Sequence, residues 1–277
     1  MTATENIVVV SGDFDDIRSR HVRFLQEAAR LGDLHVLLWN DEFLHQFTKK
    51  APKFPEQERL YYLRAIRFVR KVHPLQGTWD TDALPNIPDV QPTVWAVTES
   101  EHTPKKKAFC QDKNLRYEII TQQQLQGFPD NNTNEPSRDI YRKKVLVTGC
   151  YDWFHSGHVR FFEECSELGD LYVIVGHDAN IKALKGPGHP MFSDKERRYM
   201  VQSVRYVRQA LISTGNGWLD AEPEIERIKP DIYAVNEDGD KPIKRRYCQE
   251  HGIEYVVLKR LPKPGLQQRE STNLRGF

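Results

Sequence analysis

The sequence is poor in cysteine, in long apolar runs and in net charge, and each shortage excludes a class of protein. Four scattered cysteines among 277 residues argue against a disulfide scaffold or a zinc knuckle. No apolar run approaches the roughly 18 residues that a membrane-spanning helix needs, and the N-terminus does not resemble a signal peptide. The sequence has forty basic and thirty-nine acidic residues, and this balance gives no electrostatic reason for binding nucleic acid or a membrane surface. The basic runs 105–107 and 244–246 are interpreted as solvated helix faces. We expect a soluble, cytoplasmic protein with reduced thiols.

The most informative feature is a pattern that occurs twice. Residues 11–25 and 148–162 both run from a Ser/Thr-Gly pair through an aspartate to His-Val-Arg-Phe. The agreement continues further along the chain, with Leu-Gly-Asp-Leu at 31–34 and 168–171 and with Glu-Arg at 58–59 and 196–197. Self-similarity of this kind indicates a tandem duplication. We predict domains at 1–120 and 143–277, joined by an amide-rich linker at 121–142 that contains two prolines and has no periodicity.

Each copy alternates between strand and helix patterns. In the second copy, the run Val145–Val147 is typical of a buried parallel strand, and a helix with Val159, Phe162 and Cys165 on one face follows it. Gly169 is expected to cap that helix. Further strands are predicted at 171–176, 231–235 and 254–258, and helices at 196–207 and 242–251. The alternation predicts α/β architecture, with two tandem Rossmann-like, doubly wound parallel sheets that bind ligands at the carboxyl ends of their strands.

The segment 149–158, Gly-Cys-Tyr-Asp-Trp-Phe-His-Ser-Gly-His, lies where the first strand of the second copy turns into a helix. Backbone N–H groups and the helix dipole favour an anion at such a point. His155 and His158 can donate hydrogen bonds to phosphate oxygens, and Gly157 would let a phosphate approach the backbone. The segment therefore indicates a phosphate site.

Two later segments support this interpretation. Lys182 and Lys185 stand in a glycine-rich stretch that would form a cationic loop. Ser271 and Thr272 could cap a terminal helix and bond phosphate oxygens. Each segment alone also fits a plain structural role, as solvated lysines or an ordinary helix cap. Their conjunction with the histidines favours phosphate binding.

Together with Glu-Arg at the start of a helix that ends in Arg-Tyr-Val, these motifs resemble those of the cytidylyltransferase-like nucleotidyltransferases. That family includes glycerol-3-phosphate and ethanolamine-phosphate cytidylyltransferases and heptose-phosphate adenylyltransferases. The resemblance covers residues 143–277 and, more weakly, 5–120. It implies transfer of CMP from CTP to a phosphorylated small alcohol, polyol or sugar, with release of pyrophosphate. The alternatives are adenylyl transfer from ATP to a sugar phosphate and a non-catalytic nucleotide-binding protein. The nucleotide would bring its own Mg²⁺, with no metal ligands from the protein.

The resemblance also implies a role for each matching residue. His155, His158, Lys182 and Lys185 would be catalytic and would stabilise charge on the reacting phosphates. Asp152 and Trp153 would contact the acceptor, although Trp153 could instead pack. Nucleotide binding is implied for Gly149, Cys150, Tyr151, Gly157, Arg205, Asn236, Asp238, Ser271 and Thr272.

Two departures from the family pattern stand out. Glu270 replaces the first serine of the usual Ser-Thr-Thr, which places a carboxylate beside the phosphates unless Arg269 or Arg275 compensates for it. In the first copy, Arg18 and Arg20 replace the first histidine and the glycine, while His21 remains; His45 and Thr48 stand where the lysines should be. Arg20 would then fill the phosphate space, and we expect residues 1–120 to be non-catalytic. They would supply an internal pseudo-dimer contact, with further homo-oligomers possible. The rival interpretation is an anion site for the acceptor at Arg18, Arg20 and His21.

Overall fold

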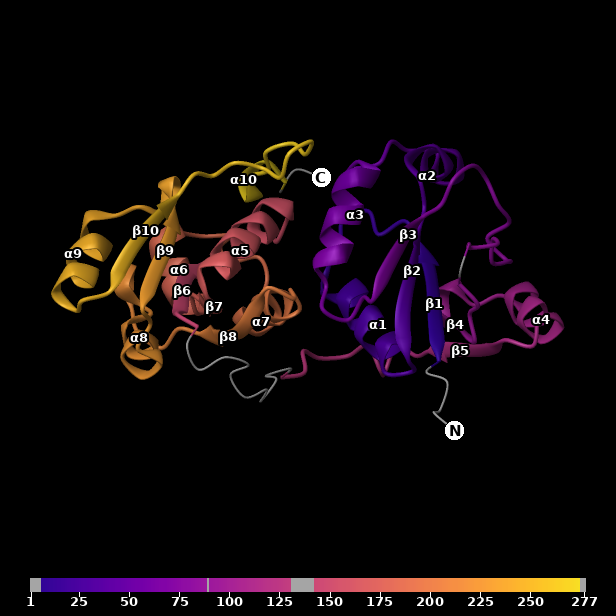
Figure 1. The fold of residues 1–277 in the computed structure, drawn as a ribbon, viewed down its shortest axis with the longest axis horizontal. Coiled ribbons are helices and arrows are strands. Elements are labelled where there is room, and N and C mark those ends of the chain that lie inside the picture. Colours follow the sequence, from indigo (N-terminus) through magenta and orange to yellow (C-terminus); the bar gives the residue numbers. More distant parts are fainter. Residues whose placement is uncertain (1–5, 89, 131–141, 275–277) are drawn as a thin grey trace. The chain divides into compact units, whose positions relative to one another are not determined.

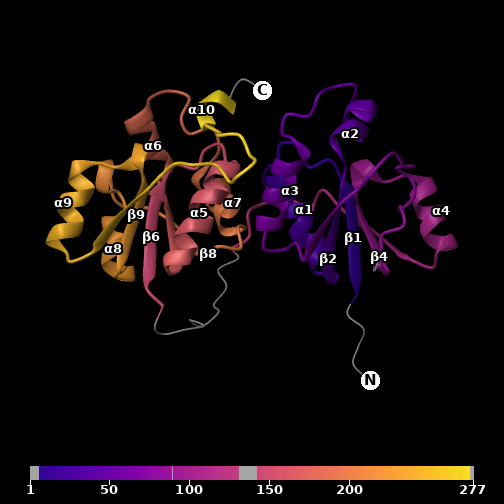
Figure 2. The ribbon, with the colours of Figure 1, turned by 45° about the horizontal axis from the view of Figure 1, so that its top comes forward.

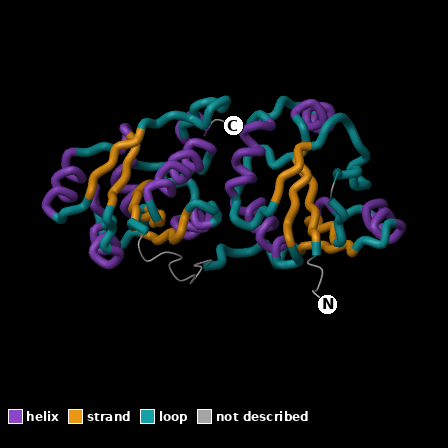
Figure 3. Tube along the Cα trace, viewed as in Figure 1, coloured by secondary structure: helices purple, strands orange, loops and turns teal. Residues whose placement is uncertain are grey.

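In a computed structural model, the chain forms two compact units, Met1–Gly127 and Phe128–Phe277. The structure describes residues 6–88, 90–130 and 142–274, with only the backbone at 272 and 273. Each unit is a five-stranded parallel sheet with helices on both faces (Figures 1 and 3). The two Rossmann-like α/β folds are thus confirmed. The unit boundary falls within the segment predicted as a linker, of which 131–141 lie outside the described residues.

The N-terminal unit has the strand order β3-β2-β1-β4-β5, and all its strand pairs are parallel. Its strands are β1 (Ile7–Gly12), β2 (Asp33–Leu38), β3 (Lys71–Pro74), β4 (Val94–Thr98) and β5 (Arg116–Ile120). Its helices are α1 (Ser19–Ala29), α2 (Asp41–Thr48), α3 (Glu56–Ala65) and α4 (Pro104–Asp112), with a 3₁₀ turn η1 (Glu99–Glu101).

The C-terminal unit repeats this topology in the order β10-β9-β6-β7-β8. Its strands are β6 (Lys144–Gly149), β7 (Asp170–Val175), β8 (Val207–Ile212), β9 (Ile232–Asn236) and β10 (Glu254–Leu258). Its helices are α5 (Ser156–Leu168), α6 (Asp178–Lys185), α7 (Asp194–Gln202), α8 (Glu222–Ile228), α9 (Pro242–Glu250) and α10 (Ser271–Leu274), with 3₁₀ turns η2 (Gly217–Leu219) and η3 (Glu237–Gly239). The chain winds outward in both directions from β6, so the sheet reverses beside β6, where ligands bind in such folds.

One predicted helix is too long. The helix expected over 196–207 ends at Gln202, and Val207 begins β8 at the edge of the sheet. The side chain of Gln202 explains the change of direction, since its Oε1 accepts a hydrogen bond from the Ala210 backbone N–H at 2.7 Å. Val204 and Val207 are both buried, so burial of β-branched side chains drives the tight return.

A buried arginine holds the corresponding loops together in both units. In the C-terminal unit, Arg197 donates to the carbonyl oxygens of Phe192, Cys150 and Gly176 at 2.9, 2.6 and 2.8 Å. It also pairs with Asp178 at 2.7 Å. Arg59 makes the equivalent contacts in the N-terminal unit. The repeated Glu-Arg motif therefore fixes the ends of the first two strands, where the predicted site lies.

Gly169 ends α5, as predicted, but its backbone is extended and the reason for glycine is a close approach. A Cβ at this position would lie 2.1 Å from the carbonyl oxygen of Lys143. The next residue, Asp170, donates its backbone N–H to that same oxygen at 2.8 Å, which starts the pairing of β7 with β6.

Nothing in the described ranges resembles a membrane-spanning segment, because every helix there is too short or too polar to cross a bilayer. The four cysteines all lie in these ranges and are free thiols.

Candidate functional site

A pocket of about 420 Å³ opens at the carboxyl edge of the C-terminal sheet. This volume is typical of small-molecule sites. Of the predicted residues, it is lined by Gly149, Cys150, Tyr151, Asp152, His158, Lys185, Asn236, Asp238 and Ser271. Its lining also includes residues that were not predicted, among them Thr148, Asn180, Trp218, Asp220, Lys244, Arg260 and Glu270.

The two predicted histidines stand together at the N-terminus of α5, with ring centroids 4.0 Å apart. The Nδ1 atom of His155 accepts the backbone N–H of Gly157 at 3.1 Å, and the Nδ1 atom of His158 accepts the backbone N–H of His155 at 3.3 Å. Because each Nδ1 is an acceptor, each neutral ring carries its proton on Nε2. The Nε2 of His155 is buried and has no hydrogen-bond partner among the described residues. Each neutral ring thus carries an N–H donor on Nε2, and His158 lines the pocket while His155 lies against it.

Gly157 also has a structural role that was not predicted, and its contact with a phosphate stays a prediction. A Cβ at this position would lie 2.9 Å from Cε1 of the His155 ring. Glycine therefore makes space for the imidazole, rather than only for a phosphate. In the first copy, Arg18 stands at the position of His155, and Arg20 stands at the position of Gly157. Because no imidazole needs the space there, a side chain is tolerated at Arg20, which is exposed. Its exposure gives no support to the prediction that Arg20 fills a phosphate space.

Cations from α6 and from the loop between β10 and α10 act on the histidines. Burial lowers the pKa of His155 to about 3, and the guanidinium groups of Arg260 and Arg269 add to the effect. Burial also lowers the pKa of His158, with further contributions from His155, Arg260 and Lys185. Both rings are therefore neutral donors at pH 7. Positive charge gathered around neutral N–H donors is the electrostatic environment that an oligophosphate requires.

The low histidine pKa values predict a distinctive loss of stability in acid. Below pH 6.5, the unfolded chain protonates His155 while the folded unit does not, so the free energy of unfolding falls by about 1.4 kcal/mol per pH unit down to about pH 3. His155→Asn keeps an acceptor for Gly157 and removes the titrating ring. Urea unfolding between pH 7 and pH 5 should therefore show a shallower pH dependence in this variant. Equal slopes in the variant and the wild type would contradict the burial of a neutral ring.

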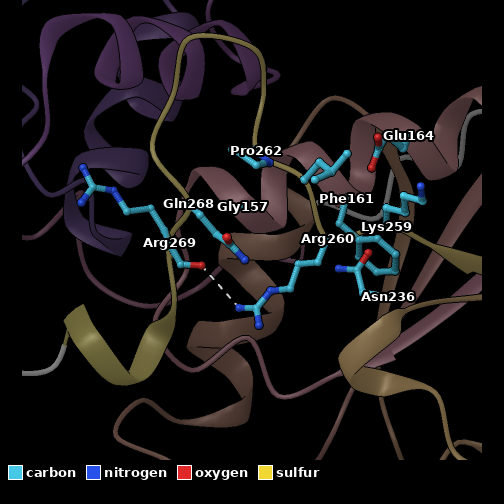
Figure 4. A pocket seen from close by; sticks show the side chains of 10 residues that line it. Gly157, Phe161, Glu164, Asn236, Lys259, Arg260, Pro262, Gln268 and Arg269 are labelled. Atoms are coloured by element: carbon cyan, nitrogen blue, oxygen red, sulfur yellow. Dashed lines mark hydrogen bonds between the residues drawn. The ribbon is translucent and has the colours of Figure 1, made fainter.

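A small hollow of about 20 Å³ lies beside the main pocket (Figure 4). It is bounded by Gly157 and Phe161 of α5, by Asn236 at the end of β9, and by Arg260, whose Nη2 donates to the carbonyl oxygen of Arg269 at 3.4 Å. Asn236 lines both cavities, and its buried Oδ1 accepts no hydrogen bond from the described part of the chain. An amine on a ligand would satisfy this oxygen.

The negative charge of Glu270 is compensated by Arg260, an arginine that the sequence analysis did not consider. Its carboxylate lies 3.6 Å from Arg260, which also pairs with Asp238 at 2.9 Å. The hydroxyl of Ser271 donates to the carbonyl oxygen of Trp153 at 3.1 Å, which fixes the start of α10 against the histidine loop. The side chain of Thr272 and all of Arg275 lie outside the described residues.

Five predicted residues that the structure describes lie outside the lining of the 420 Å³ pocket: His155, Gly157, Lys182, Arg205 and Trp153. Lys182 and Lys185 are on the last turn of α6, not on a loop, and only Lys185 lines the pocket. Lys182 instead lines a separate surface hollow with Asp178 and Ser193. Arg205 is exposed in the turn before β8. Trp153 is buried with its ring centroid 5.7 Å from that of Phe192, so it packs.

Asp152 lines the pocket, but its carboxylate is already used by the fold. Its Oδ1 accepts the backbone N–H groups of Met191 and Phe192 at 2.7 and 3.1 Å. Asp15 makes the equivalent bonds to Lys53 and Phe54 in the N-terminal unit, where most of the predicted phosphate contacts are missing. This repetition favours a positioning role for Asp152, holding the loop after α6, over the predicted contact with an acceptor.

Comparison with known proteins agrees with the geometry. A model of the cytidylyltransferase-like family matches residues 146–262. A FAD synthase from Ferroglobus placidus is 37% identical over 120 residues, which cover 42% of this chain and 75% of that enzyme. The chain belongs to the cytidylyltransferase-like family. Among its relatives is the bifunctional protein HldE from Syntrophotalea carbinolica, 32% identical over 95 residues, which are 34% of this chain and 19% of HldE. A lipopolysaccharide core biosynthesis protein from Thermoplasma volcanium superposes with a TM-score of 0.37 at 22% identity, covering 47% of this chain and 99% of that one.

The N-terminal unit of this cytidylyltransferase-like chain has an aromatic residue where the C-terminal unit has Gly176. Trp39 and Gly176 both follow the second strand and donate their backbone N–H to Gly12 and Gly149, each at 3.0 Å. The indole of Trp39 reaches Ser11 at 2.9 Å and lies against Phe43, Phe47 and Trp79. Ser11 corresponds to Thr148, which lines the pocket. The Trp39 side chain thus crosses the region that is open in the C-terminal unit.

Arg260 and Lys244 are the most important residues that the sequence analysis missed. Arg260 follows β10, the last strand of the second repeat. In such folds, residues that follow the carboxyl ends of the strands often contact ligands, so this position could have identified Arg260 from the sequence. Lys244 was assigned to a solvated basic face, but it is buried and lines the pocket. Within the described ranges, no group of three or more His, Cys, Asp or Glu side chains is placed to hold a metal ion. A Mg²⁺ ion carried by the nucleotide stays a prediction.

Proposed function

We propose that the C-terminal unit transfers AMP from ATP to a phosphorylated acceptor and releases pyrophosphate. The observation that carries the proposal is the pair of histidines at the start of α5, with His158 lining the same pocket as Lys185 and Arg260. ATP is preferred to the CTP predicted from the sequence, because the relatives include FAD synthases. FAD is FMN joined to AMP, so a synthase of FAD adenylylates a phosphate. The prediction of CTP is not confirmed.

In the proposed reaction, an oxygen of the acceptor phosphate attacks the α-phosphorus of ATP in line. The bond from that phosphorus to the oxygen bridging to the β-phosphate breaks, and pyrophosphate leaves with the bond's electron pair. The product contains AMP joined to the acceptor through a diphosphate. No covalent enzyme intermediate is needed, so catalysis consists of positioning and charge stabilisation.

His155 and His158 would hold the phosphate oxygens on which charge builds up, as neutral donors that need no reorganisation. Lys185 and Arg260, which both line the pocket, would neutralise the departing pyrophosphate. The Oδ1 of Asn236 would accept a hydrogen bond from the amine of the base. Adenine and cytosine both carry such an amine, so this contact does not select between ATP and CTP.

We further propose that the N-terminal unit does not catalyse transfer, because Trp39 crosses its equivalent region and Arg18 replaces the first histidine. Arg18 pairs with Asp16 on the protein itself. Arg18→Ala should therefore leave turnover within about twofold of the wild type, measured as pyrophosphate release. A collapse of turnover in this variant would show that the N-terminal unit takes part in the reaction. The internal pseudo-dimer contact stays a prediction.

The test of the proposed function is a pyrophosphate-release assay of ATP, CTP, UTP and GTP against FMN, a heptose 1-phosphate and glycerol 3-phosphate. We expect release with ATP, and only when an acceptor is present. Faster release with CTP would instead support cytidylyl transfer, as predicted from the sequence. Nucleotide binding without pyrophosphate release in any combination would refute the proposed transfer and favour the non-catalytic alternative.

A further inference from the structure

Lys244 is a buried lysine at the edge of the pocket. It stands in the first turn of α9 and is 8% exposed. Its Nζ donates to the hydroxyl oxygen of Thr148 at 3.2 Å, and that oxygen shares a hydrogen bond of 2.8 Å with the hydroxyl of Tyr233. The Nζ also lies 5.6 Å from the centroid of the Tyr233 ring. Both Lys244 and Thr148 line the 420 Å³ pocket.

The ammonium group has more donors than partners. Among the described residues, Thr148 is the one hydrogen-bond acceptor of its Nζ, and no carboxylate pairs with it. An ammonium carries three N–H donors, so two of them are left for another molecule. Burial lowers the pKa of Lys244, although the nearby carboxylate of Asp220 opposes the effect. Burying a charged group with so few partners is unfavourable unless a ligand completes its hydrogen bonds.

The duplicated half shows that the fold itself does not require this burial. Pro104 and Pro242 begin corresponding helices, so Lys106 occupies the position of Lys244 in the N-terminal unit. Lys106 is only partly buried, and its Nζ donates to the carbonyl oxygen of Glu101 at 2.7 Å at the surface. The inward orientation is therefore particular to the unit that has the pocket.

Lys244 approaches the pocket from the face of the sheet opposite to the histidines. Residues of α8 and α9 pack on Leu146, and Thr148 points to the same face because side chains alternate along a strand. Figure 2 shows α8 and α9 on one side of β6 and β9, and α5 on the other. Trp218, which is 55% exposed, and Asp220 line the pocket near Lys244. An aromatic face beside a donor and a carboxylate suits the body of an oxygen-rich acceptor.

We propose that Lys244 selects the acceptor, by donating hydrogen bonds to oxygen atoms on the part of that molecule that lies away from its reacting phosphate. The oxygens would be hydroxyls of a polyol or sugar, or carbonyls of a ring. The inference rests on the proposed nucleotidyl transfer and specifies which substrate this side of the pocket recognises. The nucleotide is held by the α5 side and does not contact Lys244.

The test compares Lys244→Met with Arg246→Met, which removes the same charge from an exposed position on the same helix. Pyrophosphate release is measured at saturating ATP, with FMN, heptose 1-phosphate or glycerol 3-phosphate as the varied acceptor. In K244M, the acceptor KM should rise about 10- to 100-fold, as expected for lost hydrogen bonds to a charged donor. The Kd of a non-hydrolysable ATP analogue should stay within about twofold of the wild type. R246M should match the wild type in both measurements.

A second measurement separates recognition from a structural role. Without ligands, K244M should unfold in urea at or above the wild-type midpoint, because an incompletely partnered buried charge has been removed. A lower midpoint than that of R246M, an unchanged acceptor KM, or equal weakening of nucleotide and acceptor would each overturn the inference. If the wild type releases no pyrophosphate with any acceptor, the proposed function fails, and this inference fails with it. Wild-type release with an unchanged KM in K244M overturns the inference alone.

Discussion

Replacing His158 by asparagine should lower turnover about 10²–10³-fold, the usual cost of removing one donor to a charge that develops in the transition state. The Oδ1 of asparagine can still accept the backbone N–H of His155, as Nδ1 does at 3.3 Å, so α5 keeps its cap. What is lost is the Nε2 donor. His155→Asn should behave similarly, because its Oδ1 can accept the N–H of Gly157. Single-turnover pyrophosphate release measures the effect.

Glutamine supplies the matched control. Its amide nitrogen takes the place of Nε2, so His158→Gln should recover part of the turnover that His158→Asn loses. Circular dichroism of both variants should match the wild type. His158→Gln should melt somewhat lower, because its amide cannot also accept the backbone N–H of His155. If His158→Asn keeps near-normal turnover while folded, the histidines do not stabilise the transferring phosphoryl group.

Replacing Arg197 by methionine should unfold the C-terminal unit or bring it close to unfolding. The change leaves the carbonyl oxygens of Phe192, Cys150 and Gly176 without their donor in a site where the arginine side chain is 1% exposed. At about 1–3 kcal/mol for each of the three unsatisfied groups, the loss is about 3–9 kcal/mol. Domains have about 5–15 kcal/mol of stability. Hydrogen exchange should show lost protection across 142–274.

Arg59→Met is the matched variant in the other unit, since Arg59 makes the equivalent contacts. Hydrogen exchange should show lost protection in the N-terminal unit, up to Gly127. Full protection of the C-terminal amides in Arg197→Met would show that the loops around the pocket do not depend on the buried arginine.

The duplication makes the fold highly predictable from the sequence and also separates scaffold from chemistry. Glu-Arg, the loop aspartate and the Leu-Gly-Asp turn occur in both copies, and the structure shows that they hold strand ends and loops. His155, Lys185 and Gly176 are replaced by other residue types in the first copy. Lys185 and Gly176 line the pocket, and His155 lies against His158, which also lines it. These shared features are thus structural, and features of one half point to function. His158 is an exception, because its counterpart His21 is kept in the first copy although His158 lines the pocket.

Other parts of the site depend on side-chain directions that a sequence pattern does not contain. Lys182 and Lys185 stand together in the sequence, but the last turn of α6 points only Lys185 into the pocket. Lys244 and Arg246 belong to one basic run, yet the helix turns the first inward and the second outward. Arg260 compensates the charge of Glu270, which lies ten residues later in the chain. No periodic pattern in the sequence links these two positions.

A crystal structure with a non-hydrolysable ATP analogue tests the central claim most directly. We predict phosphate oxygens within about 3.2 Å of the Nε2 atoms of His155 and His158, with the N-terminal unit empty. A nucleotide bound away from both imidazoles, or bound only beside Trp39 in the first repeat, would contradict the account.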